Sequence, residues 1–162
     1  MQTALVCFGI ALYLLAAYGD IRALRIPNLL CAAIAAVGVF RLATAGDLGT
    51  VFYTIGAAAA LFFVGALLFR HGYVGGGDVK LLTASTLLVG YRDLLPFLFV
   101  MSVCGLLVSI AVLTTKRTPL PLYLGPKFAV LAANSRLVVP YGVAIAAAGT
   151  LTLLFQSSLV GW

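Results

Sequence analysis

The chain has 162 residues, of which 64% are hydrophobic and only 9% are charged. Water-soluble domains are about half apolar and roughly a quarter charged, so this composition excludes a soluble globular protein and predicts a chain that folds in lipid. The net charge is +6, but the basic residues stand singly between apolar runs. This pattern indicates membrane orientation and contact with lipid headgroups, and it argues against a nucleic-acid surface.

Six apolar stretches predict an all-α bundle of six transmembrane helices, in one domain over residues 1–162. The stretches cover residues 3–19, 29–45, 51–69, 79–91, 94–114 and 137–156. Most approach the ~20 residues that a helix needs to cross the hydrocarbon core. The first stretch has no basic region before it and no clear small-residue cleavage site after it, so we expect a retained helix and not a signal peptide.

The fourth stretch is shorter than the others. Residues 79–91 would form a helix of about 20 Å at ~1.5 Å per residue, whereas the hydrocarbon core is ~30 Å thick. Either the glycine-rich segment before it dips into the membrane, or the helix begins earlier and includes the glycines. Both alternatives place Asp78 and Lys80 below the membrane surface.

Basic residues in the connections predict the orientation of the helices. Because Lys and Arg accumulate on the cytoplasmic side, we expect the connections after the first, third and fifth stretches to be cytoplasmic and both termini to lie outside. Those connections hold Arg22, Arg25, Arg70, Lys80, Lys116, Arg117, Lys127 and Arg136, whereas the connections after the second and fourth stretches hold only Arg41 and Arg92.

The four acidic residues of the chain are all aspartates, and the predicted topology sorts them into two pairs. Asp20 and Asp78 lie on the cytoplasmic side, each at the margin of an apolar helix, where a carboxylate is costly and usually functional. Asp47 and Asp93 lie on the opposite side, and we interpret them as ordinary loop residues.

Two carboxylates that meet in a poorly solvated site share one proton, because both cannot easily ionise together. Such a pair can activate water with one member and protonate a leaving amine with the other, as aspartic proteases do. This chemistry needs no metal or cofactor, and we expect none, since the chain has one histidine and no ligand cluster in its sequence.

The ends of the predicted helices suggest how the pair would divide its roles. Asp20 closes the first helix, where unpaired carbonyls disfavour a carboxylate, whereas Asp78 begins the fourth helix, where free N–H groups stabilise one. We therefore expect Asp78 to be the base that activates water and Asp20 to be the proton donor.

Three segments resemble motifs of the prepilin peptidases. Residues 19–28, with the sequence Gly-Asp-Ile-Arg-Ala-Leu-Arg-Ile-Pro-Asn, are similar to the first-aspartate motif of that family. Residues 75–81, with the sequence Gly-Gly-Gly-Asp-Val-Lys-Leu, resemble its GxGD signature, and residues 139–144 resemble the Pro-Tyr-Gly element of its last helix. The resemblance implies an aspartyl endopeptidase with Asp20 and Asp78 as the catalytic dyad. It would cut the leader of a type IV prepilin on the cytoplasmic side of the bacterial inner membrane.

The sequence departs from the larger members of that family in its cysteines. Those members carry paired CxxC motifs and also methylate the new N-terminus, whereas Cys7, Cys31 and Cys104 form no CxxC pair. The chain therefore resembles the short, peptidase-only branch that serves tight-adherence (Flp-type) pili, and N-methylation has no support. The expected partners are an Flp-type pilin or pseudopilin and membrane lipid, with no nucleic acid.

Residues next to the two aspartates are candidates for shaping the site. Gly75, Gly76 and Gly77 either let a substrate backbone approach Asp78 or form a flexible turn before the fourth helix. Lys80 either acts near the site, by pairing with an acidic substrate residue or by tuning Asp78, or anchors the chain at the interface.

Three further residues complete the predicted site. Pro27 is expected to open the second helix, where a missing N–H costs nothing, and Asn28 to shape the same loop. Tyr141 either lines the site or packs at a helix end. The alternatives to prepilin cleavage are preflagellin cleavage by the same chemistry and a small proton-coupled carrier.

Overall fold

The computed structural model describes residues 2–23, 26–44, 46–117 and 141–159, and every regular element in these ranges is an α-helix. The helices are α1 (Gln2–Ala23), α2 (Asn28–Thr44), α3 (Leu48–Arg70), α4 (Gly76–Val89), α5 (Leu94–Arg117) and α7 (Tyr141–Leu159). The prediction of an all-α fold is therefore confirmed for the described residues.

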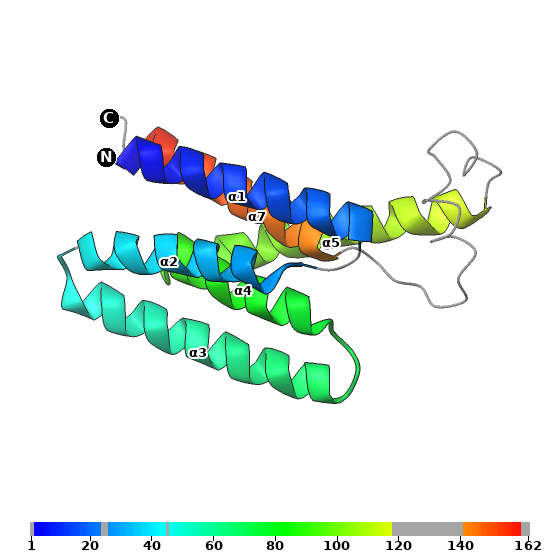
Figure 1. The fold of residues 1–162 in the computed structure, drawn as a ribbon, viewed down its shortest axis with the longest axis horizontal. Helices are drawn as coiled ribbons and strands as arrows, with labels where there is room; N and C mark the ends of the chain where they lie inside the picture. The colour runs from blue at the N-terminus through cyan, green and yellow to red at the C-terminus, as the bar shows by residue number, and fades with distance from the viewer. Residues whose placement is uncertain (1, 24–25, 45, 118–140, 160–162) are drawn as a thin grey trace.

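Successive helices run in alternating directions, as Figure 1 shows. The ends of α1, α3 and α5 and the starts of α2, α4 and α7 consequently lie toward the same end of the bundle. This arrangement brings the described parts of the three resembling segments to one end, because each of them lies at a helix terminus.

Helix α4 is the central element of the bundle. It packs against α2, α3 and α7, whereas α1 packs mainly along α7. Side chains of α4 that include Leu81 and Leu88 are almost completely buried, together with Tyr13 of α1 and Ile34 of α2. Gly38 allows α2 to approach the backbone of α4 closely, since a Cβ at Gly38 would lie 2.7 Å from the backbone of Leu87.

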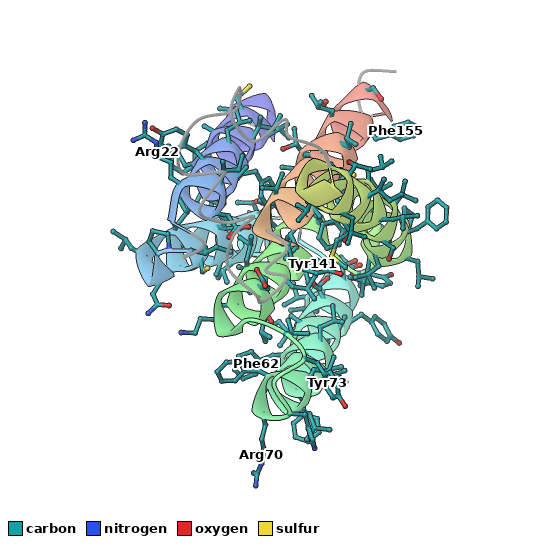
Figure 2. All side chains as sticks on the ribbon, turned by 90° about the vertical axis from the view of Figure 1, so that its right-hand side faces the viewer. Arg22, Phe62, Arg70, Tyr73, Tyr141 and Phe155 are labelled. Atoms are coloured by element: carbon teal, nitrogen blue, oxygen red, sulfur yellow. The ribbon has the colours of Figure 1, made fainter. Side chains whose placement is uncertain are left out.

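Three helices are long and apolar enough to cross a membrane, within Ala4–Arg22, Leu48–Arg70 and Leu94–Thr114. Their outer surfaces carry large exposed hydrophobic side chains, such as Phe52 and Phe63 on α3 and Phe99 on α5. Figure 2 shows Phe155 pointing away from the bundle in the same manner. A surface of this kind is stable only in contact with lipid, so the chain is a membrane protein.

The observed helices also settle two local predictions. Helix α4 begins at Gly76 with Gly75 as its N-cap and ends before Gly90, whose φ of 91° favours glycine. The second alternative for the short helix is therefore correct, because α4 includes two of the three glycines. Pro27 stands immediately before α2, whose first residue is Asn28. Its carbonyl accepts hydrogen bonds from the N–H groups of Leu30 and Cys31.

Candidate active site

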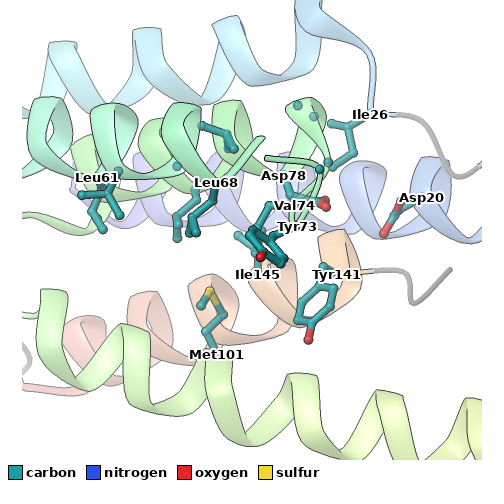
Figure 3. Close-up of a pocket in the computed structure, with 18 of the residues that line it drawn as sticks. Asp20, Ile26, Leu61, Leu68, Tyr73, Val74, Asp78, Met101, Tyr141 and Ile145 are labelled. Atoms are coloured by element: carbon teal, nitrogen blue, oxygen red, sulfur yellow. The ribbon is translucent and has the colours of Figure 1, made fainter. Parts of the chain in front are cut away.

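A cavity of about 900 Å³ lies between α3, α4, α5 and α7 and reaches the end of the bundle where α1 ends and α4 begins. Both Asp20 and Asp78 line it. Figure 3 shows the two carboxylates at one end of the cavity, with Leu61 of α3 toward the other. The wall away from the carboxylates is largely apolar, and it includes Val64 and Met101.

Asp78 is held at the start of α4. It is the third residue of the helix, and the backbone N–H of the N-cap residue, Gly75, faces its carboxylate. In a capping box the third helical residue lies in this way against the N–H of the N-cap. The local sequence therefore suffices to orient Asp78, because both partners belong to the same helix terminus.

Asp20 is oriented by a helix that is distant in the sequence. It lies in the last turn of α1 and is only 5% exposed. The backbone N–H groups of Gly142 and Val143, at the start of α7, face its carboxylate. Its buried Oδ2 atom has no hydrogen-bond partner among the described residues.

In the folded protein, the helix ends do not distinguish the two aspartates. Asp20 does lie at the end of α1, as predicted. It also faces the N-terminus of α7, whose free N–H groups stabilise an anion. Because each carboxylate faces the N-terminus of a helix, the helix ends no longer assign the base to Asp78 and the acid to Asp20.

Ile26 packs between the start of α4 and the start of α7. A Cβ at Gly77 would lie 3.6 Å from the Cβ of Ile26, and a Cβ at Gly142 would lie 2.9 Å from its Cδ1. Ile26 is 9% exposed and lines the cavity. The sequence analysis did not single out this residue, although it directly precedes Pro27 in the first motif.

The glycines before Asp78 are packed against the protein's own side chains. Besides the contact of Gly77 with Ile26, a Cβ at Gly76 would lie 3.2 Å from the Phe69 ring, and one at Gly75 would lie 2.9 Å from Oδ2 of Asp78. All three glycines line the cavity. Their small size therefore serves close packing around Asp78 and leaves backbone exposed to the cavity.

The other predicted residues divide into two groups. Asn28 and Tyr141 line the cavity, and Tyr141 also packs against α5, where a Cβ at Gly105 would lie 3.3 Å from its ring. Lys80 and Pro27 do not line the cavity. Tyr73, in the connection between α3 and α4, lines it as well, and nothing in its local sequence distinguished it from other exposed aromatic residues.

Asp47 and Asp93 lie outside this cavity. Asp47 is the N-cap of α3 and accepts hydrogen bonds from the N–H groups of Gly49 and Thr50. Asp93 accepts a hydrogen bond from Nε2 of Gln156. Within the described ranges, no three His, Cys, Asp or Glu residues cluster as metal ligands would.

These features define the class of protein: a helical membrane protein with two carboxylates at one end of a shared, mostly apolar cavity. The sequence model of the type IV leader peptidase family matches residues 7–110, a range that includes both Asp20 and Asp78. The chain belongs to this family and is accordingly a peptidase. Neither the comparison with curated proteins nor that with solved structures gives a match.

Proposed function

We propose that the chain is an aspartyl endopeptidase that removes the leader peptide of a type IV, Flp-like prepilin at the cytoplasmic face of the bacterial inner membrane. Asp20 and Asp78 form its catalytic dyad. The observation that carries the proposal is that the two carboxylates, from helices far apart in the sequence, line one cavity. The chain that holds this cavity belongs to a family of leader peptidases. The dyad lies at the end of the bundle where α1 ends and α4 and α7 begin, in a cavity that would admit the substrate.

The chemistry needs one ionised and one protonated carboxyl group. The ionised group accepts a proton from a water molecule while the water oxygen attacks the scissile carbonyl carbon. The C–N bond of the resulting tetrahedral intermediate then breaks, and the protonated group donates its proton to the leaving amine. The charge of Asp20 acts on Asp78, and two titratable groups that interact strongly take up and release protons as a pair.

Burial of the site favours this division of states. Asp20 is 5% exposed, and its Oδ2 has no partner within the described part of the chain. A buried carboxyl oxygen without a partner is costly, and a proton shared with Asp78 or a hydrogen bond from the substrate water would satisfy it. The substrate must enter as an extended segment, because a helical peptide bond hides its carbonyl in backbone hydrogen bonds.

We further propose that the chain cleaves the prepilin without methylating the new N-terminus. The sequence holds no CxxC pair, so we expect the cleaved pilin to carry a free, unmethylated N-terminus. Preflagellin cleavage uses the same dyad and differs only in substrate. A proton-coupled carrier would instead need polar groups at successive depths, and the cavity wall beyond the carboxylates is mainly apolar.

Co-expression with an Flp-like prepilin tests the proposal. Asp20→Asn and Asp78→Asn should each abolish leader removal while the protein still inserts into the membrane. Asp47→Asn and Asp93→Asn serve as matched controls and should cleave nearly normally. A gel-shift assay measures processing, and mass spectrometry of the product reads the N-terminus. Normal processing by either Asp20→Asn or Asp78→Asn would overturn the proposed dyad.

A further inference from the structure

The start of α7 forms the wall against which Asp20 packs. The N–H groups of Gly142 and Val143 face its carboxylate, and the carboxylate is nearly inaccessible. The contact joins residues from opposite ends of the chain. Unlike Asp78, Asp20 therefore depends for its orientation on how closely another helix approaches it.

Gly142 sets that distance. A Cβ at Gly142 would lie 2.7 Å from Oδ2 and 2.9 Å from Cγ of Asp20, and 2.9 Å from Cδ1 of Ile26. Nonbonded Cβ contacts below 3.0 Å are essentially never seen in real proteins. The end of Ile26 can rotate away, but the short Asp20 side chain can move only by leaving the N–H groups that face it.

We propose that Gly142 is a positioning residue for the dyad: its missing side chain lets the N-terminus of α7 close on the Asp20 carboxylate and hold it at the cavity. This inference rests on the proposed function, because it assigns Gly142 a role through Asp20. Gly142 lies outside residues 7–110, the range matched by the family model.

The groups that could confuse a pH measurement at this site are few. Among the described residues that line the cavity, the titratable ones besides Asp20 are Asp78, Tyr73 and Tyr141. Arg22, on the same helix as Asp20, lies over the ring of Tyr18. Lys80 donates its hydrogen bond to Asn28. In the pH range below neutrality, the pair of aspartates therefore dominates the profile.

The first test compares Gly142→Ala with the unaltered protein in a purified cleavage assay. We expect kcat to fall on the order of 10²-fold, since small misplacements of a catalytic group cost about that much, while KM changes by less than about threefold. The acidic limb of the pH–rate profile should move to higher pH, because the displaced N–H groups no longer stabilise the singly ionised pair. An unchanged kcat and pH profile would overturn the inference.

Two other glycines provide controls. A Cβ at Gly149, also on α7, would overlap the ring of Tyr13, so Gly149→Ala introduces a comparable clash at a site that does not line the cavity. A Cβ at Gly56 would meet nothing within 4 Å. Both variants should keep the shape and position of the pH profile. If Gly149→Ala moves the acidic limb as far as Gly142→Ala does, the role of Gly142 is general packing and the inference fails.

A stability measurement covers the case in which Gly142→Ala folds poorly. Truncation of Asp20 removes the Asp20 atoms that the new Cβ would meet and leaves the end of Ile26, which can rotate away. Gly142→Ala should therefore lower Tm much less in an Asp20→Ala background than in the unaltered protein. An equal loss of Tm in both backgrounds would show that the clash does not involve Asp20. Cleavage by Asp20→Asn would overturn the proposed function itself, whereas loss of cleavage in Asp20→Asn with normal kcat in Gly142→Ala overturns only this inference.

Discussion

The Nζ atom of Lys80 donates a hydrogen bond to Oδ1 of Asn28 at a distance of 2.9 Å. This bond joins the first turn of α4, two residues after Asp78, to the first residue of α2. It gives Lys80 a partner within the protein and leaves it outside the cavity that Asp78 lines. Lys80 therefore helps to fix the spacing of two helix N-termini at the active-site end of the bundle.

We expect Lys80→Met and Asn28→Ala to lower stability by similar small amounts, each below about 1.5 kcal/mol, because the bond is exposed to solvent. In the double variant the losses should not add, since either change removes the same bond. Thermal unfolding in detergent measures all three variants. Strictly additive losses would contradict the pairing, and a KM increase confined to Lys80→Met would instead favour contact with an acidic substrate residue.

The far end of α4 is held by a second set of side chains. Nη1 of Arg41 donates to the carbonyl of Leu88 at 2.6 Å and to Oε1 of Gln156 at 2.8 Å. Nε2 of Gln156 donates to the carbonyl of Val89 at 2.9 Å and to Asp93. The last carbonyls of a helix have no partner within it, and α4 is too short to carry them to the opposite surface. Arg41 and Gln156 satisfy them instead.

Gln156→Leu should therefore destabilise the protein by about 1–3 kcal/mol, because it leaves the partly buried carbonyl of Val89 without this donor and removes one of the two acceptors of the Arg41 guanidinium. The matched control is Ser157→Ala on the same helix, whose hydroxyl is exposed and bonds only to Leu154 of its own helix. Thermal unfolding in detergent compares the two. Cleavage at low temperature should persist in both, since neither side chain lines the cavity; equal Tm values for the two variants would contradict the role of Gln156.

Asp47 should contribute stability that depends on pH. The hydrogen bonds from the Thr50 hydroxyl and from the N–H groups of Gly49 and Thr50 hold the pKa of Asp47 below its ordinary value. A carboxyl group whose pKa is lower in the folded protein stabilises the fold at any pH above its unfolded pKa of about 3.9. This stabilisation is lost as the pH falls through the pKa of the folded state.

Asp47→Ala should consequently lower Tm at pH 7, and the difference from the unaltered protein should shrink as the pH falls below about 4. Asp47→Asn keeps a capping side chain but loses the charge, so its Tm at pH 7 should lie between the other two. A Tm difference between Asp47→Ala and the unaltered protein that is constant from pH 7 to pH 3 would contradict the role of the carboxylate.

The orientation of the helices follows from the distribution of basic residues and is open to direct measurement. In a protein whose native cysteines have been replaced, His71→Cys should react with a membrane-impermeant maleimide only after the membrane is opened. Leu48→Cys, at the opposite end of α3, should react in intact spheroplasts. Both positions are exposed. The reverse pattern would place Asp20 and Asp78 on the side away from the cytoplasm and would contradict cytoplasmic cleavage.

The helices themselves could be predicted from the sequence, because their origin is local. Apolar runs separated by polar and glycine-rich connections gave boundaries that differ from the observed ones by a few residues. For the short α4, the observed start within the glycines is one of the two alternatives that the sequence left open. The four aspartates were also sorted by their position in these runs, and the two at the margins of apolar helices are the two that line the cavity.

The environment of each aspartate could be predicted only as far as its own helix determines it. For Asp78 this was sufficient, since the N–H of Gly75 belongs to the same helix terminus. For Asp20 it was not, because the N–H groups of Gly142 and Val143 reach it only after α7 has packed along α1. For this reason the helix ends do not decide which aspartate is the acid, and the division of roles stays a prediction. The packing roles of Gly142 and Ile26, which lie within the quoted motifs, were not recognised from the sequence.

Lys80 and Arg41 show the same distinction for charged residues. From the sequence alone, Arg41 was a topology determinant and Lys80 had several possible roles. Arg41 bonds to Gln156 and to the carbonyl of Leu88, and Lys80 bonds to Asn28. All of these partners are distant in the sequence from the residue that they bind. Hydropathy and charge decide which segments enter the membrane, because each residue's transfer to lipid is its own local property. Which polar groups meet inside the bundle depends on helix packing, and only the tertiary structure decides it.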